Sequence, residues 1–419
     1  MRLVIKSLLL LCLYCLSAVS VAASALTIHD SKQDLAHHID YLEDKSQQLT
    51  VNDILSQQQQ WQKQKQDKPY FGYSQNAYWL RVNLETTAYQ QSVPRLLEIA
   101  YPLLDDIQIY LVHNQTVIQQ WHLGDKWLFE QREIPHHLFI VPINFAEQQR
   151  YQLYFRIQST SGLQVPISLW PERSFWQHDQ TRQLLLGCFY GSLIIMIAYN
   201  FFIWLSVREK SYLFYVVFVI SFGVLLATID GLSYQYLWPD AVWWNNHAIA
   251  VLLNFSLAMS LVFGRQFLNT RKFNPRLHKL ATVYMSIMFV MAALSLYVPY
   301  RTMIVVTLLF SMGTAVLVMT IGIANWRAGN RAARFFVGSW LLLASMVVLY
   351  DLSQLGIIPK STLTNLAVQI GEWCEVLLLS FALADRINIS RMQEQEAQNL
   401  LMAEERRANA EREEHLQTK

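Results

Sequence analysis

Short segments in which apolar and polar residues alternate fill the first part of the chain. In YQLYFRI, residues 151–157, the side chains at every second position share one apolar face, as expected of a half-buried strand. Four more segments follow this pattern: AYWLRVNLE, DDIQIYLVH, HHLFIVPIN and VPISLWP. Turn-forming residues separate the segments and no long helical pattern lies among them, so we expect an all-β sandwich of about eight strands.

The pattern changes on both sides of these strands. Residues 29–63 are polar and rich in glutamine, and LAHHIDYLE within them is a candidate short helix. After Gln183 long apolar runs follow, each near the length that an α-helix needs to cross hydrocarbon. Seven such spans can be counted, the third of them marginal in length: about 184–207, 212–230, 248–264, 280–298, 302–325, 335–351 and 363–385.

The charges in the connecting loops predict the orientation of the spans. The loops after spans one, three and five carry ten Lys and Arg residues, whereas the alternate loops carry only Arg301 and Lys360. Basic loops stay in the cytoplasm, so the sandwich is expected in the periplasm and the C-terminus in the cytoplasm. Trp238, Trp243 and Trp244 then fall in an outer loop, where they suit an interfacial aromatic belt better than a ligand site.

Composition and the N-terminus support a membrane protein. With 53% hydrophobic and 15% charged residues, the chain is too apolar for a soluble protein of 419 residues. Arg2 and Lys6 flank an apolar stretch that ends in small residues, which predicts a cleaved signal peptide, with an uncleaved anchor as the alternative. The predicted domains are a signal peptide at 1–25, a periplasmic β-sandwich at 26–180, a seven-helix membrane domain at 184–385 and a cytoplasmic helix at 386–419.

The positions of the cysteines and the net charge restrict how the sandwich folds and what the protein binds. Cysteines lie in the signal peptide and at Cys188 and Cys374 in the spans, so the sandwich has to fold without a disulfide. A net charge of +2 does not indicate a basic surface that would bind nucleic acid. No cofactor is predicted, and the lipid bilayer is an expected partner.

Several stretches resemble one known family across nearly the whole mature chain. KPYFGYSQNAYWLRVNL, LLEIAYPLLDDIQIYL, LGDKWLFEQREIPHHLFIVPI and YFRIQSTSGLQVPISLW are similar to the extracellular domain of the bacterial seven-transmembrane receptors with diverse intracellular signalling modules. GCFYGSLIIMIAYNFFIWLSVREKSYLFYVVF and IGEWCEVLLLSFALADRI resemble the first and last spans of that family. The resemblance implies that the sandwich at 26–180 is a periplasmic sensor domain, a jelly roll similar to carbohydrate-binding modules that binds a small ligand. It also implies that the inner-membrane bundle and the signalling helix at 386–419 drive a cytoplasmic signalling module, a diguanylate cyclase or a histidine kinase.

The C-terminal segment departs from that family pattern. After ADRI the chain continues as a Glu, Arg, Ala and Leu-rich helical stretch without Gly or Pro, and neither a cyclase box nor a nucleotide-binding glycine motif follows. His415 lacks the surroundings of a phosphoacceptor. We therefore expect a receptor with a signalling helix and no output enzyme in this sequence. Its heptads are poor, because Arg407 follows Leu400 and Ala403 at the core positions, so a weak or regulated homodimeric coiled coil is favoured.

Two carboxylates stand inside the last apolar run. Glu372 and Glu375 lie three residues apart, hence on one helix face, and should point into the bundle or towards water. One interpretation is that they bond to polar groups of other spans and bias the seating of the seventh helix. The alternatives are a purely structural bond between helices or a role in ion transfer. Candidate partners are Asn200, Asn254 and Gln369, and the candidate signal-transmitting residues are Glu372, Glu375, Asp385 and Arg386.

The alternation in two strands suggests a ligand-binding face. Trp79 and Arg81 share the side of YWLRVNL opposite its apolar face, and Tyr154 and Arg156 share the corresponding side of YQLYFRI. An exposed face with aromatic rings and guanidinium groups could bind sugars or small acidic metabolites. The alternative interpretation is that these residues pack beneath loops that cover the sheet.

Other sites and function classes find less support. His136 and His137 form half of a possible metal site, but a pair at the start of a strand is the simpler interpretation without a neighbouring acidic or Cys cluster. A transporter would require broken helices or internal repeats, and a membrane enzyme a convergent catalytic set; neither pattern is clear. A receptor is favoured over a transporter, an enzyme or a membrane scaffold for a separate partner.

Overall fold

The computed structural model describes residues 25–56, 59–64, 69–72, 74–87, 94–330, 332–354, 358 and 362–417. The chain falls into two compact units, Met1–Gln177 and His178–Lys419, and each is described by itself. The predicted signal peptide lies outside the described residues, apart from Ala25.

The first unit is built from strands joined by short connections. Its strands are β1 (Leu26–Thr27), β2 (Gln33–Asp34), β3 (Ile39–Asp44), β4 (Gln62–Lys63), β5 (Ala77–Glu85), β6 (Arg95–Ile99), β7 (Asp106–His113), β8 (Thr116–Leu123), β9 (Phe139–Ile143), β10 (Arg150–Gln158) and β11 (Ile167–Pro171). Three short helices accompany them: η1 (Ala36–His38), α2 (Val51–Ser56) and η2 (Phe129–Gln131).

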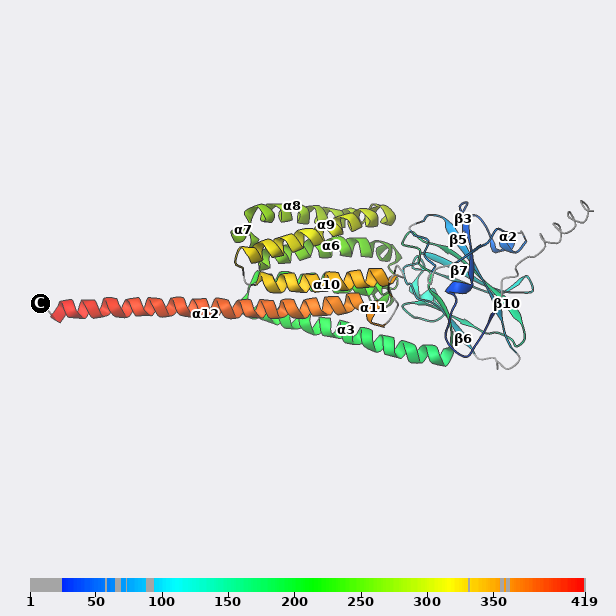
Figure 1. Cartoon of the computed structure of the whole chain (residues 1–419), viewed down its shortest axis with the longest axis horizontal. Coiled ribbons are helices and arrows are strands. Elements are labelled where there is room, and N and C mark those ends of the chain that lie inside the picture. The colour runs from blue at the N-terminus through cyan, green and yellow to red at the C-terminus, as the bar shows by residue number, and fades with distance from the viewer. Residues whose placement is uncertain are drawn as a thin grey trace, which may run out of the picture. The chain divides into compact units, whose positions relative to one another are not determined.

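These strands form two sheets that enclose one core. The larger sheet has the order β4-β3-β5-β10-β7-β8 with β1 beside β5, and the smaller has the order β2-β11-β6-β9. Apolar residues such as Leu80 of β5, Phe139 of β9 and Phe155 of β10 belong to one buried cluster that both sheets line. The predicted all-β sandwich is confirmed (Figure 1).

One local prediction was wrong, and strand β8 was among the strands that the sequence pattern did not mark. The candidate helix in LAHHIDYLE is wrong: only η1 is helical there, and Ile39–Asp44 is strand β3. Pairing of β3 with β5 gives those residues a ladder of hydrogen bonds that overrides the local pattern. Strand β8 has no apolar face strong enough to stand out, and its hairpin with β7 turns at Asn114 and Gln115, whose φ angles are 48° and 60°.

The second unit contains the predicted membrane bundle. Among the described residues seven helices are long and apolar enough to cross a membrane, which confirms the number of spans. They are α3 (Glu172–Val207), α4 (Lys210–Ile229), α6 (Val242–Phe267), α8 (Pro275–Leu294), α9 (Tyr300–Arg327), α10 (Ala333–Gln354) and α12 (Ala367–Gln417). The third is not marginal, because α6 begins at Val242 and takes in the tryptophan pair that the sequence placed in a loop.

Short helices connect several spans, and the last span is unusually long. The connecting helices are α5 (Leu232–Tyr236), α7 (Thr270–Phe273) and α11 (Thr362–Asn365). Helix α12 runs for 51 residues without a break (Figure 1), so the seventh span and the predicted signalling helix are one element. The side chains of Asp385 and Arg386 lie outside what the structure describes, although both residues are helical.

Helices α10 and α12 approach each other closely at a glycine. A Cβ atom placed on Gly371 of α12 would lie 2.8 Å from the Cβ of Met346 and 3.2 Å from Leu343 Cδ1, both on α10. Small residues let membrane helices pack tightly in this way. Gly371 therefore allows the seating of α12 against α10.

We expect Gly371→Ala to destabilise the bundle by about 1–3 kcal/mol, because the added methyl group has no room against Met346. The measurement is thermal unfolding of the full chain in detergent. Gly338→Ala on α10 is the matched control, since an added Cβ there meets nothing within 4 Å. Equal melting temperatures for the two variants would show that the close approach is not a constraint.

Candidate functional site

The four residues proposed for ligand capture do lie together on the larger sheet. In the antiparallel pairing of β5 with β10, Trp79 is opposite Arg156 and Arg81 is opposite Tyr154. The sequence could not show this neighbourhood, because alternation defines the face of each strand but not which strands pair.

This face is covered, however, so the prediction of an exposed aromatic surface is wrong. Trp79 has 0% of its surface exposed and Tyr154 has 4%. Both belong to a buried cluster with Ile54 of α2, against which Trp61 also packs. The polar, glutamine-rich region before β5 thus supplies the apolar residues that cover the sheet, which agrees with the alternative interpretation of these side chains as packing residues.

The two arginines of this face are also engaged. Arg81 donates a hydrogen bond to Asp40 Oδ2 at 2.9 Å, and its guanidinium lies 4.5 Å from the ring centre of Trp61. Burial raises the pKa of the Tyr154 hydroxyl, and the charge of Arg81 opposes that rise. Arg156 differs from Arg81, because it points towards the edge of the covered face, where it donates to Gln47 O at 3.0 Å and to Asp106 Oδ2 at 3.4 Å.

Beside Arg156 the sandwich has a polar cleft of about 560 Å³. The start of β7, the end of β8 and the end of β10 contribute to it, together with the loops that follow β3 and β8. The residues that give it its chemistry are Asp105, Asp106, His122, Lys126, Trp127 and Gln158. Sequence reasoning missed this site, because its residues come from separate turns and none of them forms a motif.

The carboxylates of the cleft are already paired within the protein. Asp106 accepts hydrogen bonds from Trp127 Nε1 at 3.1 Å and from Arg156, and it lies against His122 Nε2. Asp105 forms an ion pair with Lys126 at 2.6 Å. A carboxylate with such partners is a poor site for a free cation.

The remaining lining favours a neutral polar molecule. Side-chain amides of four glutamines line the cleft, and each amide can donate and accept hydrogen bonds. The indole of Trp127 is 39% exposed and its ring lies 4.4 Å from that of His122, so the cleft is bordered by aromatic surface. Amides next to an aromatic ring match the chemistry of a molecule with several hydroxyl groups.

In the membrane unit, helix α12 is joined to two other spans through one serine. Asn200 of α3 donates to Ser380 Oγ at 3.0 Å, and Tyr215 of α4 lies 3.3 Å from the same oxygen. Tyr215 also donates to the backbone oxygen of Val376 at 2.7 Å. Ser380 was not predicted, because a single serine in an apolar span gives no signal in the sequence.

The two buried glutamates do not have the predicted partners. Glu372 and Glu375 are both 0% exposed, and among the described residues no hydrogen bond joins either carboxyl group to another helix. The predicted bond to Asn200 is replaced by its bond to Ser380. Asn254 instead donates to Thr307 Oγ1 at 2.8 Å, which ties α6 to α9. The carboxyls are thus buried in the bundle as predicted, but without the predicted bonds to Asn200, Asn254 or Gln369.

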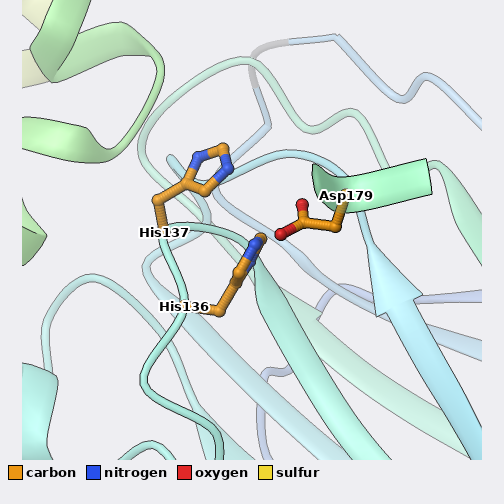
Figure 2. A group of neighbouring side chains, drawn as sticks. All are labelled: His136, His137 and Asp179. Atoms are coloured by element: carbon orange, nitrogen blue, oxygen red, sulfur yellow. The ribbon is translucent and has the colours of Figure 1, made fainter. Parts of the chain in front are cut away.

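The histidine pair has a structural role at the start of β9. The ring centres of His136 and His137 lie 4.5 Å apart, and His136 Nδ1 accepts the backbone N–H of Leu138 at 3.1 Å. Asp179 is the third potential metal ligand drawn in Figure 2, but it belongs to the second unit, where Arg182 Nε donates to it at 3.0 Å. Two ligands from one unit fall short of a metal centre, so none is assigned.

Comparison with protein families matches both units of the chain. A model described as 7TMR-DISM extracellular 2 matches residues 36–171, and one described as 7TM diverse intracellular signalling matches residues 182–386. No curated protein matches the chain. The two models cover the sandwich and the seven-helix bundle in the order found here, so the chain belongs to the family of multi-pass membrane receptors with diverse intracellular signalling modules.

Proposed function

We propose that this receptor senses a small polar ligand in the periplasm and passes the signal through its seven spans to a cytoplasmic output module. The observation that carries the proposal is helix α12, which continues unbroken from the bundle into a polar, charged segment. Such a helix can carry a displacement across the membrane surface, whereas a flexible linker cannot. The proposal assigns no catalytic step to the sandwich or the bundle, and cyclase or kinase chemistry would belong to the output module.

The distribution of basic residues supports an inner-membrane orientation with the sandwich outside. Ten Lys and Arg residues lie in the loops after spans one, three and five, against two in the alternate loops. This asymmetry favours a cytoplasmic position for α12 beyond the seventh span. Several apolar residues of that segment are exposed, including Leu400, Leu401 and Met402, which supports a homodimer through this helix.

Reporter fusions test the orientation. A reporter that is active only in the periplasm should work when fused after Trp176, and a reporter that is active only in the cytoplasm should work after Lys419, because basic loops resist translocation. Enzyme activity and fluorescence at equal expression are the measurements. The opposite pattern would contradict both the periplasmic sensor and the cytoplasmic helix.

The ligand site in this proposal is the polar cleft rather than the covered face of β5 and β10. Its amides and the exposed ring of Trp127 suit a carbohydrate or another small polar metabolite. Arg156, one of the four residues singled out from the sequence, helps to form the site through Asp106. Trp79, Arg81 and Tyr154 are packing residues beneath α2 and Trp61.

For a test of the cleft, the full chain is fused after Lys419 to a cyclase from a related receptor, and sugars and small metabolites are screened for a response. We expect Trp127→Ala to raise the concentration needed for half response about tenfold, equivalent to about 1.4 kcal/mol of binding energy. Tyr70→Ala is the matched control, because Tyr70 is exposed on the sandwich but does not line the cleft. If the two variants respond alike, the cleft is not the ligand site.

Signal transmission would depend on the seating of α12. In this state Glu372 and Glu375 are buried without a bond to another helix, while Ser380 is bonded, so a second seating that gave the carboxyl groups partners would compete with the present one. A ligand selects between two seatings only by binding one of them more tightly.

Basal output of the same fusion tests this role. Glu372→Gln or Glu375→Gln should shift the balance by roughly 0.6 to 2 kcal/mol, the scale of hydrogen bonds between helices in bilayers. Two glycines inserted after Arg391 should abolish the response while expression and surface exposure of the sandwich stay unchanged. A normal response after the glycine insertion, or wild-type output from both Gln variants, would make α12 a passive anchor.

A further inference from the structure

A third carboxyl group, that of Asp125, lies next to the cleft residues Asp105 and Lys126. Asp125 follows β8 and is 8% exposed, and its backbone N–H donates to Leu104 O at 2.9 Å. Its Oδ1 atom is buried and has no hydrogen-bond partner among the described residues. Asp125 does not line the cleft itself. Asp105, which follows Leu104 in the chain, and Lys126, which follows Asp125, both do.

The backbone before Asp125 is tightly packed at Gly124. Gly124 has a φ of +148°, and a Cβ on it would lie 2.0 Å from the backbone oxygen of Asp105. The peptide before Asp125 therefore packs directly on the backbone of Asp105. This contact and the bond from Asp125 N–H to Leu104 O hold Asp125 close to Asp105.

Asp105 in turn holds one wall of the cleft. Its carboxylate accepts the backbone N–H of Thr160 at 3.0 Å and the Thr160 hydroxyl at 2.7 Å. It also accepts the Ser159 hydroxyl at 3.0 Å and pairs with Lys126 Nζ at 2.6 Å. Ser159, Thr160 and Lys126 all line the cleft, so this one carboxylate fixes the segment after β10 to the loop after β8.

Three charged groups face Asp125 from the surrounding elements. They are Asp105 before β7, Lys126 in its own loop and Arg132 after η2. Burial, and next to it the negative charge of Asp105, raises the pKa of Asp125 to about 7, while Arg132 and Lys126 oppose the rise. The carboxyl group therefore changes charge near neutral pH.

We propose that Asp125 is a proton-operated latch on the ligand cleft. When Asp125 is neutral, Asp105 alone binds Lys126 and keeps its bonds to Ser159 and Thr160. When Asp125 is ionised, the two carboxylates repel each other and compete for Lys126, so the segment at 159–160 loosens and the cleft opens. The latch rests on the proposed ligand cleft, but it can be tested without any ligand.

The same titration affects folding with a defined sign. The folded chain holds a proton on Asp125 at pH values where the unfolded chain, with a carboxyl pKa near 3.8, has lost it. The contribution of Asp125 to the free energy of unfolding is therefore largest below pH 3.8, falls as the pH rises to about 7 and stays level above it. Asp125→Asn, which keeps the shape without the charge, should lack this fall.

Hydrogen–deuterium exchange of the purified full chain in detergent tests the latch at pH 6 and pH 8. After correction for intrinsic exchange rates, we expect protection of the Thr160 amide to fall at least tenfold at pH 8 in the wild type. Asp125→Asn should show equal protection at both pH values. Asp53→Asn is the control, because Asp53 is an exposed carboxylate bonded to Thr50 and distant in sequence from the latch, and it should behave as the wild type.

Either unchanged protection in the wild type or a pH-dependent loss in Asp125→Asn would overturn the latch. If Asp125→Asn does not fold, Lys126→Met provides the second test: the charge of Lys126 lowers the pKa of Asp125, so its removal should move the loss of Thr160 protection to higher pH. An unchanged midpoint of that loss in Lys126→Met would also overturn the latch. A normal ligand response in Trp127→Ala, by contrast, would refute the proposed ligand site and leave the latch result standing.

Discussion

The bilayer interior offers no hydrogen-bond partners, and this constraint governs the arrangement of the seven spans. Helices satisfy their own backbone groups, so what remains to be settled is where buried polar side chains find partners. Asn200 and Tyr215 both reach Ser380, which fixes α12 against α3 and α4. Glu372 and Glu375 lie on the same helix with no bond to another span among the described residues. Helix α12 therefore carries one buried polar side chain that is bonded to other spans, Ser380, and two that are not, Glu372 and Glu375.

The helix that carries these side chains, α12, cannot bend easily. Helix α12 has neither Pro nor Gly between Gly371 and its end at Gln417, so a movement at the membrane is carried along the helix axis. At its other end along the chain, the membrane domain follows the sandwich without a loop in the sequence, since α3 begins directly after strand β11. The first turn of α3 packs on the sandwich through Phe175, whose ring lies 6.1 Å from that of Trp170.

Much of the fold, but little of the site, could be predicted from the sequence. Alternation marks β5 and β10 because their faces differ in burial, and apolar length marks the spans because hydrocarbon requires it. The same alternation could not show that Trp79 is covered, because its cover comes from α2 and Trp61, in a region whose composition is mostly polar. The cleft escaped prediction for a related reason, since Trp127 and Gln158 meet only after the strands pair.

The sandwich and the bundle use buried polar groups in the same way. In the sandwich, Asp105 is hydrogen-bonded while Oδ1 of the neighbouring Asp125 has no partner among the described residues. In the bundle, Ser380 of α12 is bonded to α3 while Glu375 of the same helix has no bond to another span among the described residues. An unsatisfied buried group costs free energy, so it lowers the difference between the observed arrangement and a competing one. A receptor requires this small difference, because a ligand of modest affinity can shift a population only when the two states lie within a few kcal/mol. In the proposed mechanism, these incompletely hydrogen-bonded carboxyl groups make the elements around them responsive.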